Sequence, residues 1–162
     1  MCQTFLYGLK NGSFRSVFYW HLLYIDTTEI HSFWVETPSN TEHLEFGFAA
    51  KVDGTVIPSN VPPRDSATQS YILSCNYQNQ GTAAVLIDGS RFTTFPIKCG
   101  EKDDRVHILI SSINRKIYFD IYKHNEATYR RRSINYDTTL PLVMVVGAAK
   151  HDEEIAMYNF RC

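Results

Sequence analysis

A chain of 162 residues has the usual size of one domain, and no flexible polar linker divides it, so a single domain is expected over residues 1–162. Hydrophobic residues make up 44% and charged residues 20%, which excludes a disordered chain, and the 14% of aromatic residues favours strands. The formal charge of -1 gives no field that would attract a polyanion, so nucleic acid is excluded as an expected partner.

Short segments that are apolar, or that alternate between apolar and polar residues, recur along the chain with turn residues between them. This rhythm is typical of antiparallel β-sandwiches and barrels. The predicted strands are, in chain order, Thr4 to Leu9, Phe14 to Ile25, His31 to Glu36, Glu42 to Ala50, Ser70 to Cys75, Ala83 to Asp88, Phe92 to Lys98, Arg105 to Ser111, Lys116 to Tyr122, Ala127 to Ser133, Leu140 to Ala148 and Glu154 to Phe160.

Two patterns indicate how these strands are buried. Residues 106–110 and 117–122 alternate strictly, as expected when one face of a sheet meets the core and the other meets solvent. Residues 142–146 are apolar on both faces, which predicts a central strand that is covered on each side. No segment has a competing helical period. The fold class predicted is therefore all-β, a two-sheet antiparallel β-sandwich.

The connections carry typical turn residues. Asn11-Gly12, Asp53-Gly54 and Asp88-Gly89 tolerate positive φ and each lies between two candidate strands, which predicts three hairpins. Residues 112–115 form a fourth short connection. The stretch between Ile57 and Gln69 holds three prolines and almost no apolar residue, which predicts the longest surface loop.

The four cysteines, Cys2, Cys75, Cys99 and Cys162, are widely scattered, and no pair has zinc-ligand spacing. An even number permits two disulfides, but a chain of this length can build a core without them. We therefore expect reduced, structural thiols.

No window approaches the run of about 20 apolar residues that crosses a bilayer, and the first residues lack the pattern of a secretory leader. We expect no membrane insertion. The compartment is left open between the cytoplasm and a fragment of a surface protein, and the oligomeric state is not predicted.

The sequence shows no local signature of catalysis. The GxSxG motif of many hydrolases is absent. Six histidines are present, at positions 21, 31, 43, 107, 124 and 151, and because a triad could be assembled from any of them, we interpret them as strand or loop histidines without a catalytic task. Phosphate-binding GxGxxG and GxxxxGK loops are also missing. We expect no enzymatic activity and no cofactor.

Two acidic clusters offer carboxylates that could bind calcium: Glu101, Asp103 and Asp104, and then residues 152–154. Neither has the spacing of a helix-loop-helix calcium site, and both fall in strand connections. We interpret them as solvated charge and expect no metal.

Candidate ligand-binding residues come from the aromatic and arginine side chains. Arg130, Arg131 and Arg132 follow Tyr129, and on a strand Arg130 and Arg132 face one way while Arg131 faces the other. Stacking surfaces are offered by Tyr19, Trp20, Trp34, Tyr77, Tyr118, Tyr129 and Tyr136, of which the two loop tyrosines, 77 and 136, are preferred. The predicted site residues are Tyr77, Asn79, Tyr129, Arg130, Arg132 and Tyr136.

The later part of the chain resembles a known family. Residues 71–79, YILSCNYQN, followed by residues 82–87, TAAVLI, resemble the YEI-x-x-G-x-W-x-N-x-x-S-x-I stretch of the domain named after farnesoic acid O-methyltransferase. Residues 135–142 and Val146-Gly147 are similar to its W-x-D-x-x-P-x-P-(aliphatic)-x-x-V-G stretch, and residues 33–35 followed by 42–44 to its F-x-V-x-A-x-x-D-x-H-I segment. The resemblance implies a concanavalin-like sandwich that acts as a binding or interaction module.

A second resemblance lies near the start of the chain. Residues 17–23, VFYWHLL, look like the V-D-Y-W-x-L-L strand of the rotavirus spike head, and residues 133–137 are loosely similar to a later segment of it. This resemblance implies a galectin-like, jelly-roll sandwich that binds cell-surface glycans. Both resemblances lead to the same broad architecture.

The function predicted is a non-enzymatic recognition module for a glycan or a protein partner. Two alternatives stay open: a glycan-binding receptor domain of a viral spike, and a methyltransferase acting on a small terpenoid acid. The second would have to bind S-adenosylmethionine, for which the sequence offers no recognisable loop.

Overall fold

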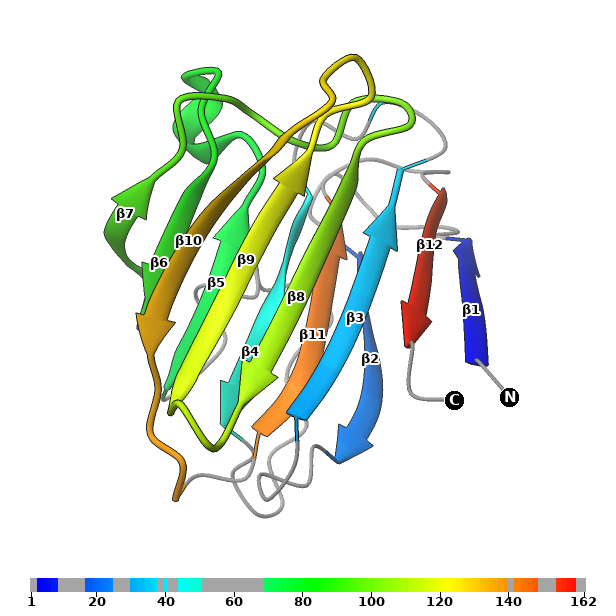
Figure 1. The fold of residues 1–162 in the computed structure, drawn as a ribbon. Coiled ribbons are helices and arrows are strands. Elements are labelled where there is room, and N and C mark those ends of the chain that lie inside the picture. Colours follow the sequence, from blue (N-terminus) through cyan, green and yellow to red (C-terminus); the bar gives the residue numbers. More distant parts are fainter. Residues whose placement is uncertain are drawn as a thin grey trace.

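A computed structural model describes residues 3–8, 17–24, 30–37, 40, 44–50, 69–139, 142–148 and 154–159. The described residues are mostly strand (Figure 1), with one short 3-10 turn, η2 (Tyr77–Asn79). The strands are β1 (Gln3–Gly8), β2 (Val17–Tyr24), β3 (Ile30–Glu36), β4 (Glu45–Ala50), β5 (Ser70–Ser74), β6 (Ala84–Ile87), β7 (Ser90–Thr94), β8 (Arg105–Ser111), β9 (Lys116–Tyr122), β10 (Tyr129–Asn135), β11 (Leu142–Ala148) and β12 (Glu154–Asn159). A strand is present at each predicted segment, although several strands begin or end at other residues than predicted.

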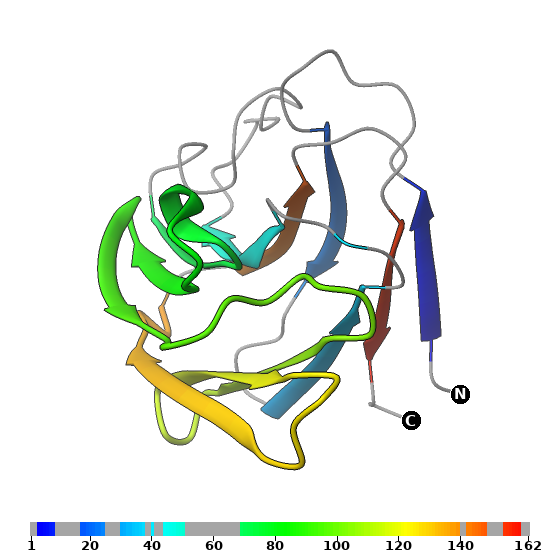
Figure 2. The same ribbon diagram turned by 90° about the horizontal axis from the view of Figure 1, so that it is seen from above.

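The strands form two six-stranded sheets that face each other (Figure 2). Sheet A has the order β1-β12-β3-β8-β9-β10, and sheet B has the order β2-β11-β4-β5-β6-β7. Neighbouring strands are antiparallel, so the predicted two-sheet antiparallel sandwich is confirmed. The strand β11 lies between β2 and β4, as its apolar sequence predicted, and the first strand pairs with the last.

The core lies between the two sheets and is filled by every second residue of the strands. On β8 and β9 the inward side chains are aliphatic or aromatic, and in sheet A they include Ile108, Ile117 and Phe119, each 0% exposed. They belong to one hydrophobic cluster with Phe46 and Phe48 from sheet B. Full burial of side chains of this size contributes roughly 1.5–3 kcal/mol each. The period-two pattern therefore predicted which faces of β8 and β9 are buried.

The turn after β6 confirms one predicted hairpin. Asp88 has φ of 52° and Gly89 has φ of 81°, the left-handed pair that a two-residue hairpin loop requires. Because this loop is so short, β7 begins at Ser90 rather than at Phe92 as predicted, and it ends at Thr94, ahead of Pro96, which has no N–H to donate. The predicted hairpins at Asn11-Gly12 and Asp53-Gly54 and most of the long loop lie outside the described residues.

The expectation of reduced thiols is wrong for Cys75 and Cys99. These two residues form a disulfide, with their Cα atoms 4.5 Å apart. Cys75 directly follows β5, and its N–H donates to the Leu44 carbonyl oxygen, while the Cys99 N–H donates to the Cys75 carbonyl oxygen. Spacing along the sequence gave no indication of this pairing, because it depends on how the segments that follow β5 and β7 of sheet B come to lie side by side. Cys2 and Cys162 lie outside the described residues.

Candidate functional site

The outer face of sheet A carries a group of aromatic, arginine, histidine and aspartate side chains that contact one another. The alternation that buries about every second residue of β3, β8 and β9 turns the remaining residues towards solvent, and most side chains of the edge strand β10 are exposed. Strand register aligns these outward residues in rows across the sheet. One row is Trp34, His107, Asp120 and Arg131, and the next is Glu36, Arg105, Tyr122 and Tyr129.

Aromatic rings of the two rows are in contact with one another. The Trp34 ring stacks on His107, with centroids 4.6 Å apart, and lies 5.2 Å from the Tyr122 ring. The Tyr122 ring in turn stacks on Tyr129 at 4.9 Å. Tyr129 is 46% exposed, so its ring is accessible from solvent.

Two arginines are placed over these rings. The Arg105 guanidinium carbon lies 5.3 Å from the Trp34 ring centroid and 5.7 Å from that of Tyr122. The Arg131 guanidinium carbon lies 5.0 Å from the Tyr118 ring and 5.6 Å from the Tyr129 ring. These are favourable cation–π distances. We refer to the whole set as the outer patch, which comprises Trp34, Arg105, Tyr118, Tyr122, Tyr129 and Arg131.

Polar side chains form a hydrogen-bonded chain beside the outer patch. Arg131 donates to Asp120 through Nε at 2.7 Å and through Nη2 at 3.0 Å, so the pair is bidentate. Nδ1 of His107 lies 3.2 Å from Oδ2 of Asp120, and Nε2 of the same ring is hydrogen-bonded to the Ser32 hydroxyl. The order across the sheet is therefore Ser32, His107, Asp120 and Arg131.

Asp120 is 1% exposed although it belongs to the outer face. Burial acts to raise the pKa of its carboxyl, but the hydrogen bonds from His107 and Arg131 together outweigh burial and hold that pKa below its ordinary value. Asp120 is therefore ionised at neutral pH and can only accept hydrogen bonds. Since Asp120 only accepts, Nδ1 of His107 must carry the proton that it donates.

Three of the predicted site residues lie together on β10. Tyr129 faces outwards in the outer patch, while Arg130 and Arg132 alternate to the other side, as predicted. Arg132 lies over the Phe95 ring, with its guanidinium carbon 5.1 Å from the centroid, and donates to the Thr94 carbonyl oxygen. This arginine therefore ties the edge of sheet A to the edge of sheet B.

Tyr77 and Asn79 form the short turn η2 between β5 and β6. The N–H of Gly81 donates to the Asn76 side chain at 2.8 Å, which holds this turn, and Asn79 is exposed. In Figure 1 this green turn lies at the same end of the sandwich as the start of β10, but it belongs to the other sheet.

Tyr136 lies in the hydrophobic core rather than on the surface. It is 7% exposed and its ring packs edge-on against Tyr71, with centroids 6.3 Å apart. Burial raises the pKa of its hydroxyl. The position after β10 suggested an exposed loop tyrosine, but the ring turns under the sheet, so it offers no stacking surface to a ligand.

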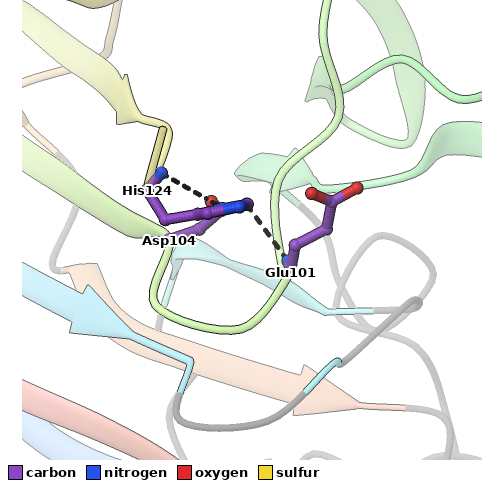
Figure 3. A group of neighbouring side chains, drawn as sticks. All are labelled: Glu101, Asp104 and His124. Atoms are coloured by element: carbon purple, nitrogen blue, oxygen red, sulfur yellow. Dashed lines mark hydrogen bonds and ion pairs between the residues drawn. The ribbon is translucent and has the colours of Figure 1, made fainter. Parts of the chain in front are cut away.

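The first acidic cluster is also more buried than its composition suggested. Asp104 is 1% exposed, so the interpretation as solvated charge is wrong for this residue. Figure 3 shows Asp104 between His124, whose Nδ1 lies 2.9 Å from Oδ1, and the backbone N–H of Glu101, which donates to Oδ2 at 3.1 Å. The second cluster, residues 152–154, lies almost wholly outside the described residues.

The ammonium group of Lys123 already occupies the cluster of Glu101, Asp104 and His124. Its Nζ lies 2.6 Å from Asp104 and 3.0 Å from Glu101, and the hydrogen bond from Lys123 is the main reason that the pKa of Glu101 is lowered. A cation would have to displace this ammonium group. Residues around the cluster line a pocket of about 340 Å³ that also includes Asn40 and Lys98.

Sequence reasoning missed Arg105, His107, Asp120 and Tyr122, but part of the signal was present. The short connection at residues 112–115 pairs Ser111 with Lys116, and counting back along both strands places His107 opposite Asp120. The pairing of β3 with β8 brings Ser32 and Trp34 next to His107, which is about 75 residues away in the sequence. No local sequence pattern indicates that these two strands pair.

The architecture is that of a concanavalin-like β-sandwich, as the first sequence resemblance implied, and the second implied the same broad two-sheet architecture. No model of a known protein family matches the chain, and no curated protein matches it. The resemblances to the farnesoic acid O-methyltransferase-type domain and to the rotavirus spike head therefore rest on the quoted motifs alone. No helix in the described segments is long and apolar enough to cross a membrane.

Solved structures with this fold include plant lectins and SPRY domains. The basic winged bean lectin, in a crystal structure with Tn-antigen, is 9% identical over 98% of both chains, with a TM-score of 0.56. Lectin II from Ulex europaeus is 12% identical over 96% of this chain and 91% of its own, with a TM-score of 0.56. The SPRY domain of human HERC1 is 11% identical over 93% of this chain and 87% of its own, with a TM-score of 0.63. Identities this low show a shared fold alone.

Proposed function

We propose that the chain is a recognition module that binds a glycan through the outer patch of sheet A. The observation that carries this proposal is the outward-facing group of half-buried Trp34 and Tyr122 and exposed Tyr129, with Arg105 over two of the rings. Aromatic rings pack against the C–H faces of a sugar, and arginine and phenol groups hydrogen-bond to its hydroxyl or carboxylate oxygens.

The outer patch is suited to binding because its side chains already hold one another in place. Tyr122 is packed between Trp34 and Tyr129, so little rotamer freedom is left to lose when a ligand arrives. Burial raises the pKa of Tyr122, and the phenol therefore stays neutral and able to donate a hydrogen bond. Arg105 makes no ion pair with any residue in the described part of the chain, which leaves its guanidinium for a ligand.

The similar structures support recognition as the general function. Winged bean acidic lectin has been solved in complex with methyl-α-D-galactose, and lectin UEA-II in complex with galactose. Galactose-containing glycans are therefore the first probes to test on this chain.

A glycan array read with the purified chain tests the proposal. Trp34→Ala and Arg105→Ala are expected to weaken the strongest signal about 30-fold, the effect of losing a side chain worth about 2 kcal/mol at an interface. Phe92→Ala is the matched control, because Phe92 is 62% exposed on β7 of sheet B and lies outside the outer patch. Equal losses in the three variants, or no loss in the first two, would exclude the outer patch as the binding site.

The predicted loop residues need a separate measurement. Tyr77→Ala removes the ring of the η2 turn without touching sheet A. A loss of array signal in this variant with Trp34→Ala unaffected would move the proposed site to the turn.

A protein partner is the second candidate, since exposed Tyr129 and Arg131 are residue types that dominate protein interfaces. A silent array together with a pull-down that depends on Tyr129 would favour it. Methyl transfer is checked by titration with S-adenosylmethionine, for which no heat of binding is expected.

A further inference from the structure

We infer that Ser32, His107 and Asp120 form an esterase-type triad, in which the Ser32 hydroxyl is a nucleophile that accepts an acyl group from activated esters. The Ser32 hydroxyl is hydrogen-bonded to Nε2 of His107, and Nδ1 of the same ring lies 3.2 Å from Oδ2 of Asp120. This is the arrangement of nucleophile, base and orienting carboxylate that defines serine hydrolases on unrelated folds. Ser32 lies outside the outer patch, so the inference does not depend on glycan binding.

The protonation states follow from the acceptors. Asp120 is ionised and fixed by a bidentate pair with Arg131, so it must accept the proton on Nδ1 of His107. In the neutral ring Nε2 is then an acceptor, and the Ser32 hydroxyl donates to it. The hydroxyl proton is therefore already directed towards the base. Asp120 acts as a positioning residue, because it contacts His107 and not the ester.

The reaction balances with water as the only other reactant. His107 Nε2 takes the Ser32 proton as Oγ attacks the ester carbonyl carbon, and the bond between that carbon and the leaving oxygen then breaks. The same proton passes from His107 to the leaving group, which departs as an alcohol. Water, deprotonated by His107, then attacks acyl-Ser32 and releases a carboxylic acid with the hydroxyl restored.

The geometry also limits the rate. Ser32 lies within β3 on an open sheet face, and among the described residues no helix N-terminus flanks it to stabilise the oxyanion. Arg131 shares the Asp120 carboxylate, which reduces the charge that can stabilise a protonated His107. General-base assistance is worth about 10²–10⁴-fold, and we expect the lower end, with esters of good leaving groups only.

Acetylation by p-nitrophenyl acetate, mapped by peptide mass spectrometry, tests the inference in the full chain. Ser133 is the internal control, since it lies in the same cross-strand row as Ser32, is exposed, and receives no hydrogen bond from the described residues. Ser32 is expected to be acetylated about 10²-fold faster than Ser133. His107→Gln is expected to bring Ser32 down to the rate of Ser133.

Two outcomes would overturn the inference: equal rates at Ser32 and Ser133 in the folded chain, or fast acetylation of Ser32 that survives His107→Gln. The acetylation rates of Ser32 and Ser133 can also be compared in the wild-type chain unfolded in urea. This measurement needs no variant, so it tests the inference even if His107→Gln does not fold. Unfolding separates Ser32 from His107, which is 75 residues away, so the rate advantage must disappear in urea.

Discussion

Asp120 shows how a single residue can be buried on the outside of a sheet. Its neighbours in the same row are His107 and Arg131, and both reach over the carboxylate and hydrogen-bond to it. A buried carboxylate without such partners would be strongly destabilising. The alternating pattern of β9 indicated an outward-facing acid, but only the partners on β8 and β10 explain why it is not solvated.

The lowered pKa of Asp120 gives a pH dependence with a defined sign. A carboxyl whose folded pKa lies below the unfolded value stabilises the fold at neutral pH, and that contribution is lost as pH falls through the folded pKa. Urea unfolding of the wild-type chain from pH 7 towards strong acid should therefore show declining stability. Asp120→Asn should show a shallower decline of the free energy of unfolding with falling pH than the wild-type chain. Identical slopes in the two chains would mean that Asp120 makes no pH-dependent contribution to stability.

Gly47 is a residue that the close approach of two strands requires. A Cβ built at this position in β4 would lie 2.0 Å from the carbonyl oxygen of Tyr71 on β5, which is backbone and cannot move aside. Gly47→Ala is expected to lower the free energy of unfolding by about 1–3 kcal/mol, measured in urea. Gly81→Ala is the control without a clash, because no atom lies within 4 Å of a Cβ at that position. Its positive φ causes only local backbone strain in the variant. A smaller loss at Gly47 than at Gly81 would contradict the close approach.

At the scale of elements, strands and short hairpins could be predicted because their signals are local. The period-two pattern predicted both ends of β8 and β9 correctly, and Asp88-Gly89 predicted the hairpin between β6 and β7. Pairings between distant strands have no such signal. The placement of β3 beside β8 depends on the strand order of the whole of sheet A, and Cys75 meets Cys99 through the side-by-side arrangement of β5, β6 and β7 in sheet B. Neither arrangement has a local sequence signal, which is why both were missed.

The Cys75–Cys99 disulfide should stabilise the fold mainly by restricting the unfolded chain. It closes a loop with a sequence separation of 24 that contains β6 and β7. Loop-closure entropy for this length corresponds to about 3 kcal/mol. The double variant Cys75→Ala/Cys99→Ala is expected to have a free energy of unfolding lower by about that amount, measured in urea without reductant. Packing of the two buried alanines would make the loss somewhat smaller. If the wild-type chain shows no loss on reduction with dithiothreitol, the disulfide does not contribute as argued.

At the scale of the whole molecule, the two sheets depend on a shared core. Phe119 of sheet A and Phe48 of sheet B belong to the same hydrophobic cluster, and Arg132 ties the sheet edges together through the Thr94 carbonyl oxygen. The pairing of β1 with β12 also joins the beginning of the chain to its end. We therefore propose that residues 1–162 form one domain.

One domain with one core should unfold in one step. Far-ultraviolet circular dichroism reports on the strands of both sheets, whereas tryptophan fluorescence reports mainly on the surroundings of individual rings such as Trp34. The urea unfolding curves followed by these two signals should nevertheless share one midpoint. Phe119→Ala removes a fully buried ring from sheet A and is expected to lower the free energy of unfolding by about 3–5 kcal/mol. It should move both curves equally, because sheet B cannot keep its inner face covered once sheet A is lost. Curves that separate in this variant would show that the sheets unfold independently.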